Sequence, residues 1–187
     1  ELVADDPLLE VLSESMLTCW QVLWDQYREL HKMLVQLVGQ EELCRRWCEI
    51  PGVGPVTAMT FMAAVDDPHR FAKSKTLGAH FGLTPKREQS GTSVDRDGHI
   101  SRRGDGEVRT ALYEAASGML TRSKQHSTLK AWGMKIATKR GHKRAVVAVA
   151  RKLAVIMHRM WIDGSRFRFS AANDHPESGG KAVAVPA

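Results

Sequence analysis

The 187-residue sequence lacks the long apolar runs and the leader segment that mark membrane or secreted proteins. No apolar stretch approaches the roughly 18 residues that a membrane-spanning helix requires, so we expect no membrane association. No basic segment followed by an apolar one stands near the first residue, which argues against secretion and favours the cytoplasm. The sequence begins at Glu1 and not at methionine, so we expect a piece of a longer protein.

The cysteines, histidines and carboxylates provide neither a disulfide framework nor a metal site. The three cysteines are an odd number, and Cys44 and Cys48 lie one helical turn apart inside an apolar pattern. A structural zinc ion needs four ligands, and the histidines show no ligand spacing. Asp95, Asp97 and the other carboxylates of the basic segment show no helical pairing that would hold Mg²⁺. We therefore expect no metal in this chain and place both cysteines in the core.

Charge is distributed unevenly along the chain. Residues 1–69 contain four Lys and Arg against twelve Asp and Glu, a balance of −8. Residues 70–169 contain twenty-two Lys and Arg against seven Asp and Glu, a balance of +15. A surface with that charge attracts polyanions and releases their counterions on binding. The pattern predicts nucleic-acid binding, and a merely solvated basic surface is the alternative.

A helical stripe of apolar residues covers residues 6–37. Its members recur at steps of three or four residues: Leu9, Leu12, Met16, Cys19, Leu23, Tyr27, Leu30, Leu34 and Leu37. This spacing is coiled-coil periodicity, and Asp6 followed by Pro7 suits the start of a helix. Trp20 and Trp24 widen the stripe. So much apolar surface needs a partner, which is either a second copy of the chain or another helix of the same chain. We favour self-association as a dimer or tetramer.

The rest of the sequence predicts a mainly α protein. Gly39 is expected to interrupt the leading helix, and shorter helices follow. Their expected ranges are 41–48, 55–65, 74–81, 106–121, 129–138 and 143–161. We divide the chain into a coiled-coil arm over residues 1–48, a compact helical domain over 49–168 and a disordered tail over 169–187.

The turn Ile50-Pro-Gly-Val-Gly-Pro55 joins two of these helices in the pattern of a helix-hairpin-helix. Gly52 and Gly54 allow positive φ, and the following helix begins with free backbone N–H groups. Such groups can hold a phosphate of a nucleic-acid backbone without reading a base. Alternatively, the two glycines only make a tight corner between packed helices.

The segment from Thr84 to Gly104 is polar, basic and poor in periodicity, which is typical of a functional loop. Asp97-Gly98 predicts the turn of a small β-hairpin, with His99 opposite Ser90 and able to position a phosphate or move a proton. Ser90, directly before a glycine and surrounded by cations, could attack a phosphodiester, or could simply bind phosphate or cap a turn. The residues that we expect to contact nucleic acid are Gly52, Gly54, Lys86, Arg87, Arg96, Arg102, Arg103, Lys143 and Arg144.

Several motifs together resemble one protein family over about residues 1–165. They are Ile50-Pro-Gly-Val-Gly-Pro-Val-Thr-Ala58, Gly82-Leu-Thr-Pro85, Pro85-x4-Ser90-Gly91, Gly98-His-Ile-Ser-Arg-Arg-Gly104 and Leu112-Tyr-Glu-Ala-Ala116. In this order the sequence resembles the C-terminal half of insertion-sequence transposases of the IS110/IS116 group, which are described as bridge-RNA-guided recombinases.

The resemblance implies a two-part DNA recombinase. An N-terminal acidic domain of the family supplies four carboxylates that bind Mg²⁺, and the C-terminal domain supplies a serine nucleophile that maps here to Ser90, with Ser93 as its competitor. The resemblance also implies DNA and a structured guide RNA as partners, subunits that assemble together, and a bacterial, nucleoid-associated protein. The acidic domain has no counterpart in this sequence, so no Mg²⁺ ligands can be assigned.

Two other functions fit parts of the sequence. A non-catalytic helix-hairpin-helix module with a coiled-coil dimerisation arm would need Gly52, Gly54 and the basic helices but not Ser90. A coiled-coil interaction protein would need only the leading stripe.

The absence of the acidic domain generates a first prediction. The purified 187-residue chain should bind nucleic acid and self-associate without cleaving DNA. The measurement is incubation of the chain with labelled DNA and Mg²⁺, followed by denaturing electrophoresis. Mg²⁺-dependent strand cleavage by this chain would refute the prediction.

Overall fold

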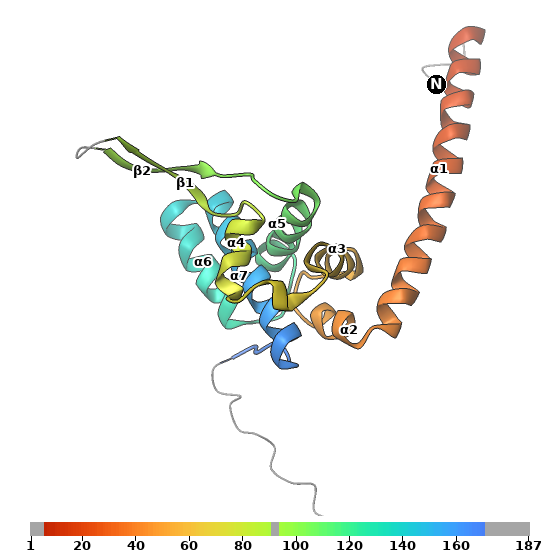
Figure 1. Cartoon of the computed structure of the whole chain (residues 1–187). Coiled ribbons are helices and arrows are strands. Elements are labelled where there is room, and N and C mark those ends of the chain that lie inside the picture. Colours follow the sequence, from red (N-terminus) through yellow and green to blue (C-terminus); the bar gives the residue numbers. More distant parts are fainter. Residues whose placement is uncertain (1–5, 91–93, 171–187) are drawn as a thin grey trace, which may run out of the picture.

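The computed structural model describes residues 6–90 and 94–170, and these residues form a mainly helical protein with one β-hairpin (Figure 1). The predicted fold class is therefore confirmed. The elements are α1 (Pro7–Gln40), α2 (Glu42–Cys48), α3 (Pro55–Val65), α4 (Leu77–His80), β1 (Pro85–Ser90), β2 (Val94–Ile100), α5 (Gly106–Thr121), α6 (Thr128–Arg140) and α7 (His142–Asp163). Two short 3₁₀ helices, η1 (Pro68–Arg70) and η2 (Ser74–Thr76), precede α4.

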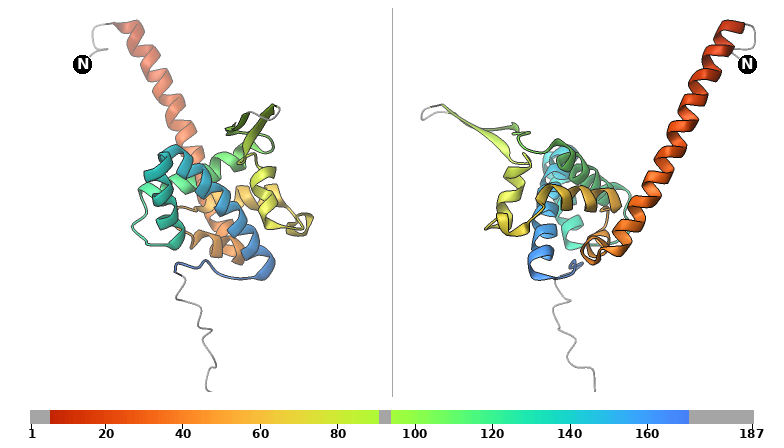
Figure 2. Two further views of the ribbon diagram at one scale, coloured as in Figure 1. Left: turned by 90° about the vertical axis from the view of Figure 1, so that its left-hand side faces the viewer. Right: turned by 45° about the vertical axis from the view of Figure 1, so that its right-hand side comes forward.

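Helix α1 projects from the compact part of the molecule as a single long arm (Figure 2). It begins as expected, because the Asp6 side chain accepts a hydrogen bond from the Leu8 N–H at 2.9 Å and Pro7 occupies the first helical position. The expected break at Gly39 is misplaced by two residues: α1 runs through Gly39 to Gln40, and Glu41 is its C-cap before α2 begins. A single glycine costs a helix only about 1 kcal/mol, which the neighbouring turns and the buried Val38 offset.

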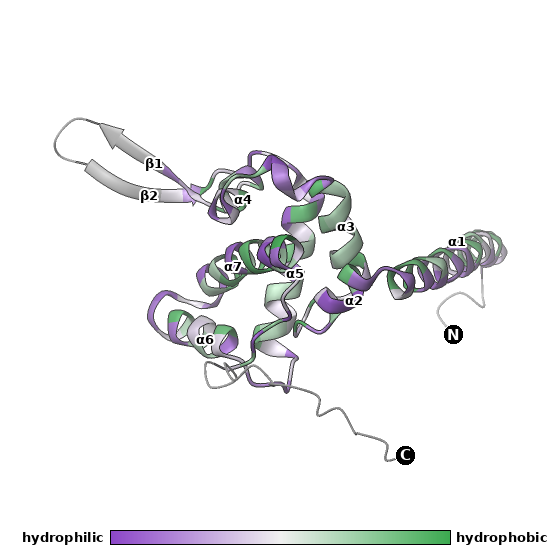
Figure 3. Ribbon diagram, turned by 60° about the horizontal axis from the view of Figure 1, so that its bottom comes forward, coloured by the Kyte–Doolittle hydropathy of each residue, from purple (hydrophilic) through white to green (hydrophobic). Residues whose placement is uncertain are grey.

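The core lies between α3, α5, α6 and α7, whose apolar sides meet inside the compact part (Figure 3). Trp47 of α2 is fully buried there, packs edge-on against Phe61 at 5.3 Å between ring centroids, and donates a hydrogen bond to the Met157 carbonyl at 3.0 Å. Helix α2, which the sequence groups with the arm, therefore contributes its apolar face to the compact core.

Cys44 is fully buried in this core, and its Sγ lies 4.0 Å from the Met62 Sδ. Burial raises the pKa of the Cys44 thiol to about 11, and burial also raises the pKa of Cys48. Both side chains are consequently neutral thiols near pH 7, and neither has the thiolate character of a reactive or metal-binding cysteine.

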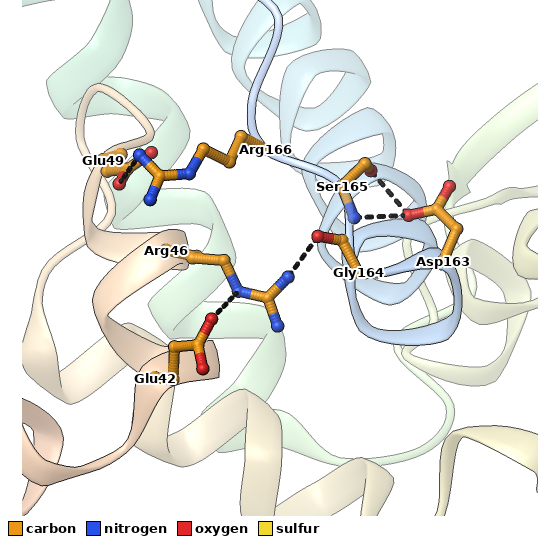
Figure 4. A network of polar contacts seen from close by, with 7 residues as sticks. All are labelled: Glu42, Arg46, Glu49, Asp163, Gly164, Ser165 and Arg166. Carbon is orange, nitrogen blue, oxygen red and sulfur yellow. Dashed lines mark hydrogen bonds and ion pairs between the residues drawn. The ribbon is translucent and has the colours of Figure 1, made fainter. Parts of the chain in front are cut away.

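The C-terminal end of α7 is held by side chains from the region of α2 (Figure 4). Arg46 donates a hydrogen bond to the Gly164 carbonyl, and Arg166 forms an ion pair with Glu49 at 3.4 Å. Asp163 accepts hydrogen bonds from the Ser165 N–H and hydroxyl, and these bonds lower the pKa of that carboxyl. Cationic groups near the carbonyl end of a helix are favourable, so α2 and α7 are fixed to each other here.

Most of the predicted tail lies outside the described residues. Its first residue, Phe169, is described, and its ring packs edge-on against Phe167 at 5.0 Å between centroids. The Thr128 N–H donates to the Phe169 carbonyl at 2.9 Å, which fixes the chain to the start of α6.

The turn between α2 and α3 packs against α5 through Gly52. This residue has a φ of +88°, and a Cβ added there would overlap the Ala115 carbonyl oxygen and lie 2.8 Å from the Met119 nitrogen. The Gly52 Cα lies 3.8 Å from the position of a Cβ added to Gly118. Gly52 is therefore required for a tight corner between packed helices, one of the two functions that the sequence allowed for it.

This contact generates a second prediction. Gly52→Ala should lower the free energy of unfolding by about 2–4 kcal/mol, because it combines an unfavourable positive φ with overpacking against backbone. Gly39→Ala is the matched control: Gly39 is helical with nothing within 4 Å of an added Cβ, so the change should stabilise α1 by about 0.5–1 kcal/mol. Urea unfolding at one fixed protein concentration measures both. Equal effects of the two variants would contradict the packing role of Gly52.

Candidate nucleic-acid interface

The β-hairpin projects from the compact part on the side away from α1 (Figure 1). Its strands pair antiparallel, with Pro85 opposite Ile100 and Ser90 opposite Val94. Ser90 is thus the last residue of β1, at the end of the hairpin farthest along the strands from its base. The structure does not describe the side chains of residues 87–97, and Ser93 lies outside the described residues.

The strand register corrects two expectations from the sequence. Asp97 is paired with Arg87 inside β2, so Asp97-Gly98 is not the turn; the chain reverses between Ser90 and Val94. His99 lies beside Ile100 near the base of the hairpin and not opposite Ser90, so the expected placement of His99 is wrong. A register fixed at the base by long-range packing outweighs the local turn preference of an Asp-Gly pair.

Two glycines set that base by close backbone approach. Gly82 has a φ of +68°, and an added Cβ there would lie 2.6 Å from the Arg103 nitrogen. Gly104 has a φ of +78°, and its added Cβ would overlap the His80 carbonyl oxygen. The Ser101 N–H donates to the Thr84 carbonyl at 2.8 Å. Segments 80–84 and 101–104 are thereby held together where the strands begin.

Arg109 of α5 ties this base to the compact part. Its guanidinium donates to the Phe81 carbonyl at 3.1 Å and to the Arg103 and Asp105 carbonyls at 3.4 Å each. Three carbonyls from two chain segments therefore converge on one side chain, which orients the hairpin relative to α5. The sequence contains no signal for this function of Arg109, because its acceptors are backbone carbonyls and one of them, that of Phe81, lies 28 residues away along the chain.

A second link to the hairpin runs through α7 and the segment before α4. His158 of α7 is buried, and its two ring nitrogens lie 2.9 Å from the Ser74 Oγ and from the Pro68 carbonyl oxygen. Both η1 and η2 are thus fixed to α7, and α4 continues directly into the hairpin base.

The described cations at the hairpin are open to solvent. Lys86 on β1 and Arg102 and Arg103 at the base are exposed. Arg102 has a φ of +55°, a backbone conformation that residues other than Gly, Asn and Asp seldom adopt. Arg87 and Arg96 belong to the two strands, one residue apart in the backbone register: Arg87 is paired with Asp97, and Glu88 is paired with Arg96.

The turn between α6 and α7 forms a separate basic surface. All six residues from Lys139 to Arg144 are exposed, and Gly141 between the helices has a φ of +86° and open space around it. Lys139 and Arg140 end α6, where cations stabilise a helix. Lys143 and Arg144 begin α7, where cations oppose the helix dipole, and no side chain caps this end. At this position Lys143 and Arg144 can bind an anion, but they do not stabilise α7.

The α2–α3 turn borders a cavity of about 700 Å³ that also touches α5. Gly54 is the N-cap of α3 without a side-chain cap, and an added Cβ there would meet nothing within 4 Å. The same cavity is lined by Glu49 and Glu114 as well as Arg122. Two carboxylates make it a poorer place for a phosphate than the hairpin or the α6–α7 turn. The described residues bring the candidate contacts together in three separate places, not in one pocket.

Within the parts of the chain that the structure describes, no cluster of His, Cys, Asp or Glu side chains is arranged to hold a metal ion. None of the described helices has the length and apolar character needed to cross a bilayer.

Comparison with known proteins gives the class of this protein. Residues 44–132 match the transposase family IS116/IS110/IS902, a stretch that contains the α2–α3 turn and the whole hairpin. A protein named "Putative transposase y4pF/y4sB" from Sinorhizobium fredii is 32% identical over 174 residues, which cover 90% of this chain and 45% of that protein.

Two further relatives carry related names. A protein from Coxiella burnetii named "Transposase for insertion sequence element IS1111A" is 39% identical over 117 residues, 62% of this chain and 32% of that protein. A "Pilin gene-inverting protein" from Moraxella bovis is 28% identical over 110 residues, 58% of this chain and 34% of that protein. The chain belongs to the IS116/IS110/IS902 transposase family, and it spans less than half the length of these relatives.

The exposed cations generate a third prediction. Arg102→Asn keeps a residue that tolerates positive φ and removes one charge, so the slope of log affinity against log salt for duplex DNA should fall by about one unit. Lys143→Gln with Arg144→Gln should lower the slope by about two units and, by relieving the dipole, raise the stability of the fold by about 0.3–1 kcal/mol per charge.

Fluorescence anisotropy across a salt series and thermal unfolding measure these two effects. Lys32→Gln is the matched control, because Lys32 is an exposed cation on α1, away from the hairpin and the α6–α7 turn. An unchanged slope in the two test variants, or an equal fall in the control, would contradict the proposed contacts.

Proposed function

We propose that this chain is the DNA-binding and serine-bearing part of a transposase that cuts and rejoins DNA in site-specific, RNA-guided transposition. The observation that carries the proposal is the place of Ser90 in the hairpin. Ser90 ends a strand of a ribbon that stands out from the compact part, with exposed cations at its base, inside the stretch that matches the family. A nucleophile that must reach a DNA backbone needs such a projecting position.

In the proposed reaction, the Ser90 Oγ attacks the phosphorus of a DNA phosphodiester. The Oγ gives up its proton, a phosphoserine bond forms, and the bond from phosphorus to one deoxyribose oxygen breaks. That oxygen leaves as a hydroxyl after taking a proton. The corresponding hydroxyl of a second cut strand then attacks the phosphoserine, forms the recombined phosphodiester and returns a proton to the released serine. Arginines of the hairpin stabilise the negative charge that develops on the phosphoryl oxygens.

The described residues do not fit a Mg²⁺ site, and the proposed steps use only the serine and the arginines of this chain. We propose that Mg²⁺ and its acidic ligands belong to a part of the transposase outside this chain. The relatives' greater length is consistent with such a further part.

The guide RNA and the DNA are proposed to share the basic segment. Backbone contacts from Lys143, Arg144 and the hairpin cations give affinity for either nucleic acid without reading its sequence. Base pairing between guide and target would then supply the specificity, so no side chain needs to read base edges. Self-association through α1 would bring two or more such chains to one assembly.

A non-catalytic helix-hairpin-helix module remains the second candidate. The observation in its favour is Gly54, which leaves the start of α3 uncapped and open toward a cavity. In that case Gly54 and the first turn of α3 hold a DNA phosphate, and Ser90 has no chemical function.

Ser90→Ala provides the fourth prediction and distinguishes the two candidates. Recombination is measured in a chimera in which this chain replaces the matching region of the Sinorhizobium transposase. Ser90→Ala should abolish recombination and the covalent protein–DNA adduct, while the affinity of the isolated chain for DNA changes less than about twofold, because one neutral hydroxyl is lost.

The controls are Ser93→Ala, which tests the competing serine, and Ser101→Ala at the hairpin base, which should retain activity. Recombination that survives Ser90→Ala and fails in Ser93→Ala would move the nucleophile to Ser93. Recombination that survives both changes would favour the non-catalytic candidate.

A further inference from the structure

The part of the chain between Glu114 and Asp163 carries charge of only one sign. Residues 115–162 contain eleven Lys and Arg and no Asp or Glu. They cover the end of α5, the whole of α6 and all of α7 except its last residue. Solvated surfaces of stable domains mix both signs, because a large field of a single sign repels itself. So many uncompensated cations in one helical unit therefore indicate a polyanionic partner.

Helix α7 carries four of these cations along its solvent side. Arg144, Arg151, Lys152 and Arg159 are all exposed, and we call them the α7 basic face. The three arginines follow one another at steps of seven and eight residues, close to two helical turns each, so they lie along one side of the helix. From its first arginine to its last, the face is about 22 Å long. A DNA duplex lying along it offers about six phosphates of each strand over that length.

No carboxylate neutralises the α7 basic face in the part of the chain that the structure describes. The ion pairs formed there by arginines join Arg46 to Glu42 and Arg166 to Glu49, and none includes a member of the face. Asp163 is the nearest acid along the helix, and it accepts hydrogen bonds from the N–H and hydroxyl of Ser165. The cations of the face can therefore bind phosphate without first breaking an ion pair.

Contacts with neighbouring helices hold the middle of the face in place. The Lys152 Nζ lies 4.0 Å from the centroid of the Trp132 ring of α6, a cation–π contact. The aliphatic part of Arg151 covers Gly78 of α4, because a Cβ added to Gly78 would lie 2.5 Å from the Arg151 Cγ. Side chains that are already restrained lose less conformational entropy on binding, so the two contacts favour association.

The α7 basic face and the hairpin lie on the same side of the molecule. The hairpin projects away from α1 in Figure 1, and the left view of Figure 2, taken from that side, shows α6 and α7 in front. Helix α4, against which Arg151 packs, continues directly into the hairpin base. The exposed Arg102 and Arg103 extend the positive charge from there toward β1. A DNA duplex that reaches the hairpin from this side therefore passes α7.

We propose that the α7 basic face binds the backbone of the DNA duplex that Ser90 attacks, with Arg151 and Arg159 as positioning residues that hold its phosphates. This inference rests on the proposed function, and it adds a binding surface that the hairpin does not contain. The contacts are to phosphates and read no base. Their effect is to hold the duplex along α7 while the hairpin reaches the strand that is cut.

Removal of two charges from the face gives the fifth prediction. Arg151→Gln combined with Arg159→Gln should lower the slope of log affinity against log salt for duplex DNA by about two units, because two phosphate contacts are lost. Glutamine keeps the Cγ and Cδ atoms that cover Gly78, so the melting temperature should stay unchanged. Arg151→Lys combined with Arg159→Lys retains both charges and should retain the slope. Fluorescence anisotropy of the isolated chain, with duplex DNA and duplex RNA of equal length, measures all four values.

Arg28→Gln combined with Lys32→Gln is the matched control, because both are exposed cations of α1 on the other side of the molecule. An unchanged DNA slope in the double glutamine variant, or an equal fall in this control, would overturn the proposal. A fall for duplex RNA alone would assign the face to RNA and overturn it as well. Arg159→Gln alone, which does not touch Gly78, should still lower the DNA slope by about one unit if the double variant fails to fold.

A DNA titration separates this inference from the proposed serine chemistry. In the recombination chimera, the double glutamine variant should lose activity at low DNA concentration and recover it at saturating DNA, because only binding is weakened. Ser90→Ala should recover at no DNA concentration. A double glutamine variant that stays inactive at saturating DNA would overturn the positioning role. Recombination by Ser90→Ala would overturn the serine function, and the salt slopes would still decide whether DNA lies on α7.

Discussion

The close approach of neighbouring helices to α7 is the constraint on which the compact part depends. The packed sides of α7 carry small residues such as Ala145, Ala150 and Ala154 among larger ones such as Leu153, and all are fully buried. Small side chains let α5 and α6 lie close to it, and α4, η1, η2 and α2 contact it as well. The solvent side of the same helix carries cations. One helix therefore both organises the core and carries positive charge on its solvent side.

Two sets of contacts connect the helices of the core to the base of the hairpin. His158 fixes the segment that leads into α4, and Arg109 of α5 holds the backbone where the strands start. Gly82 and Gly104 then allow the two segments to touch. The position of Ser90 is thus set by contacts at the hairpin base and by the strand register, both remote from the serine itself.

Sequence periodicity was sufficient to predict the helices, but it was not sufficient to predict the strand register of the hairpin. The range 106–121 and the start of α3 agree with the structure, because apolar spacing and the capping residue Asp105 act locally. The turn at Asp97-Gly98 and the position of the break at Gly39 were wrong for one reason. Each expectation used a local preference worth about 1 kcal/mol, and packing elsewhere outweighed it.

The candidate interface was predictable where it depends on charge and not where it depends on backbone contact. The +15 balance of residues 70–169 indicated nucleic acid, and the structure places Lys86, Arg102 and Arg103 in solvent. Gly52 illustrates the limit: sequence could not choose between a phosphate contact and a packed corner, because only the position of α5 decides. The function of Arg109 had no sequence signal at all.

The two-stranded hairpin has no third strand beside it among the described residues, so each of its strands is an edge strand. An isolated pair of strands is only marginally stable in water, so contacts with a ligand add directly to its order. With Ser90 as the proposed nucleophile, the reactive hydroxyl is best positioned only after a nucleic acid lies along the ribbon. Cleavage would then depend on DNA binding, because the proposed nucleophile would be positioned for attack only when DNA is bound.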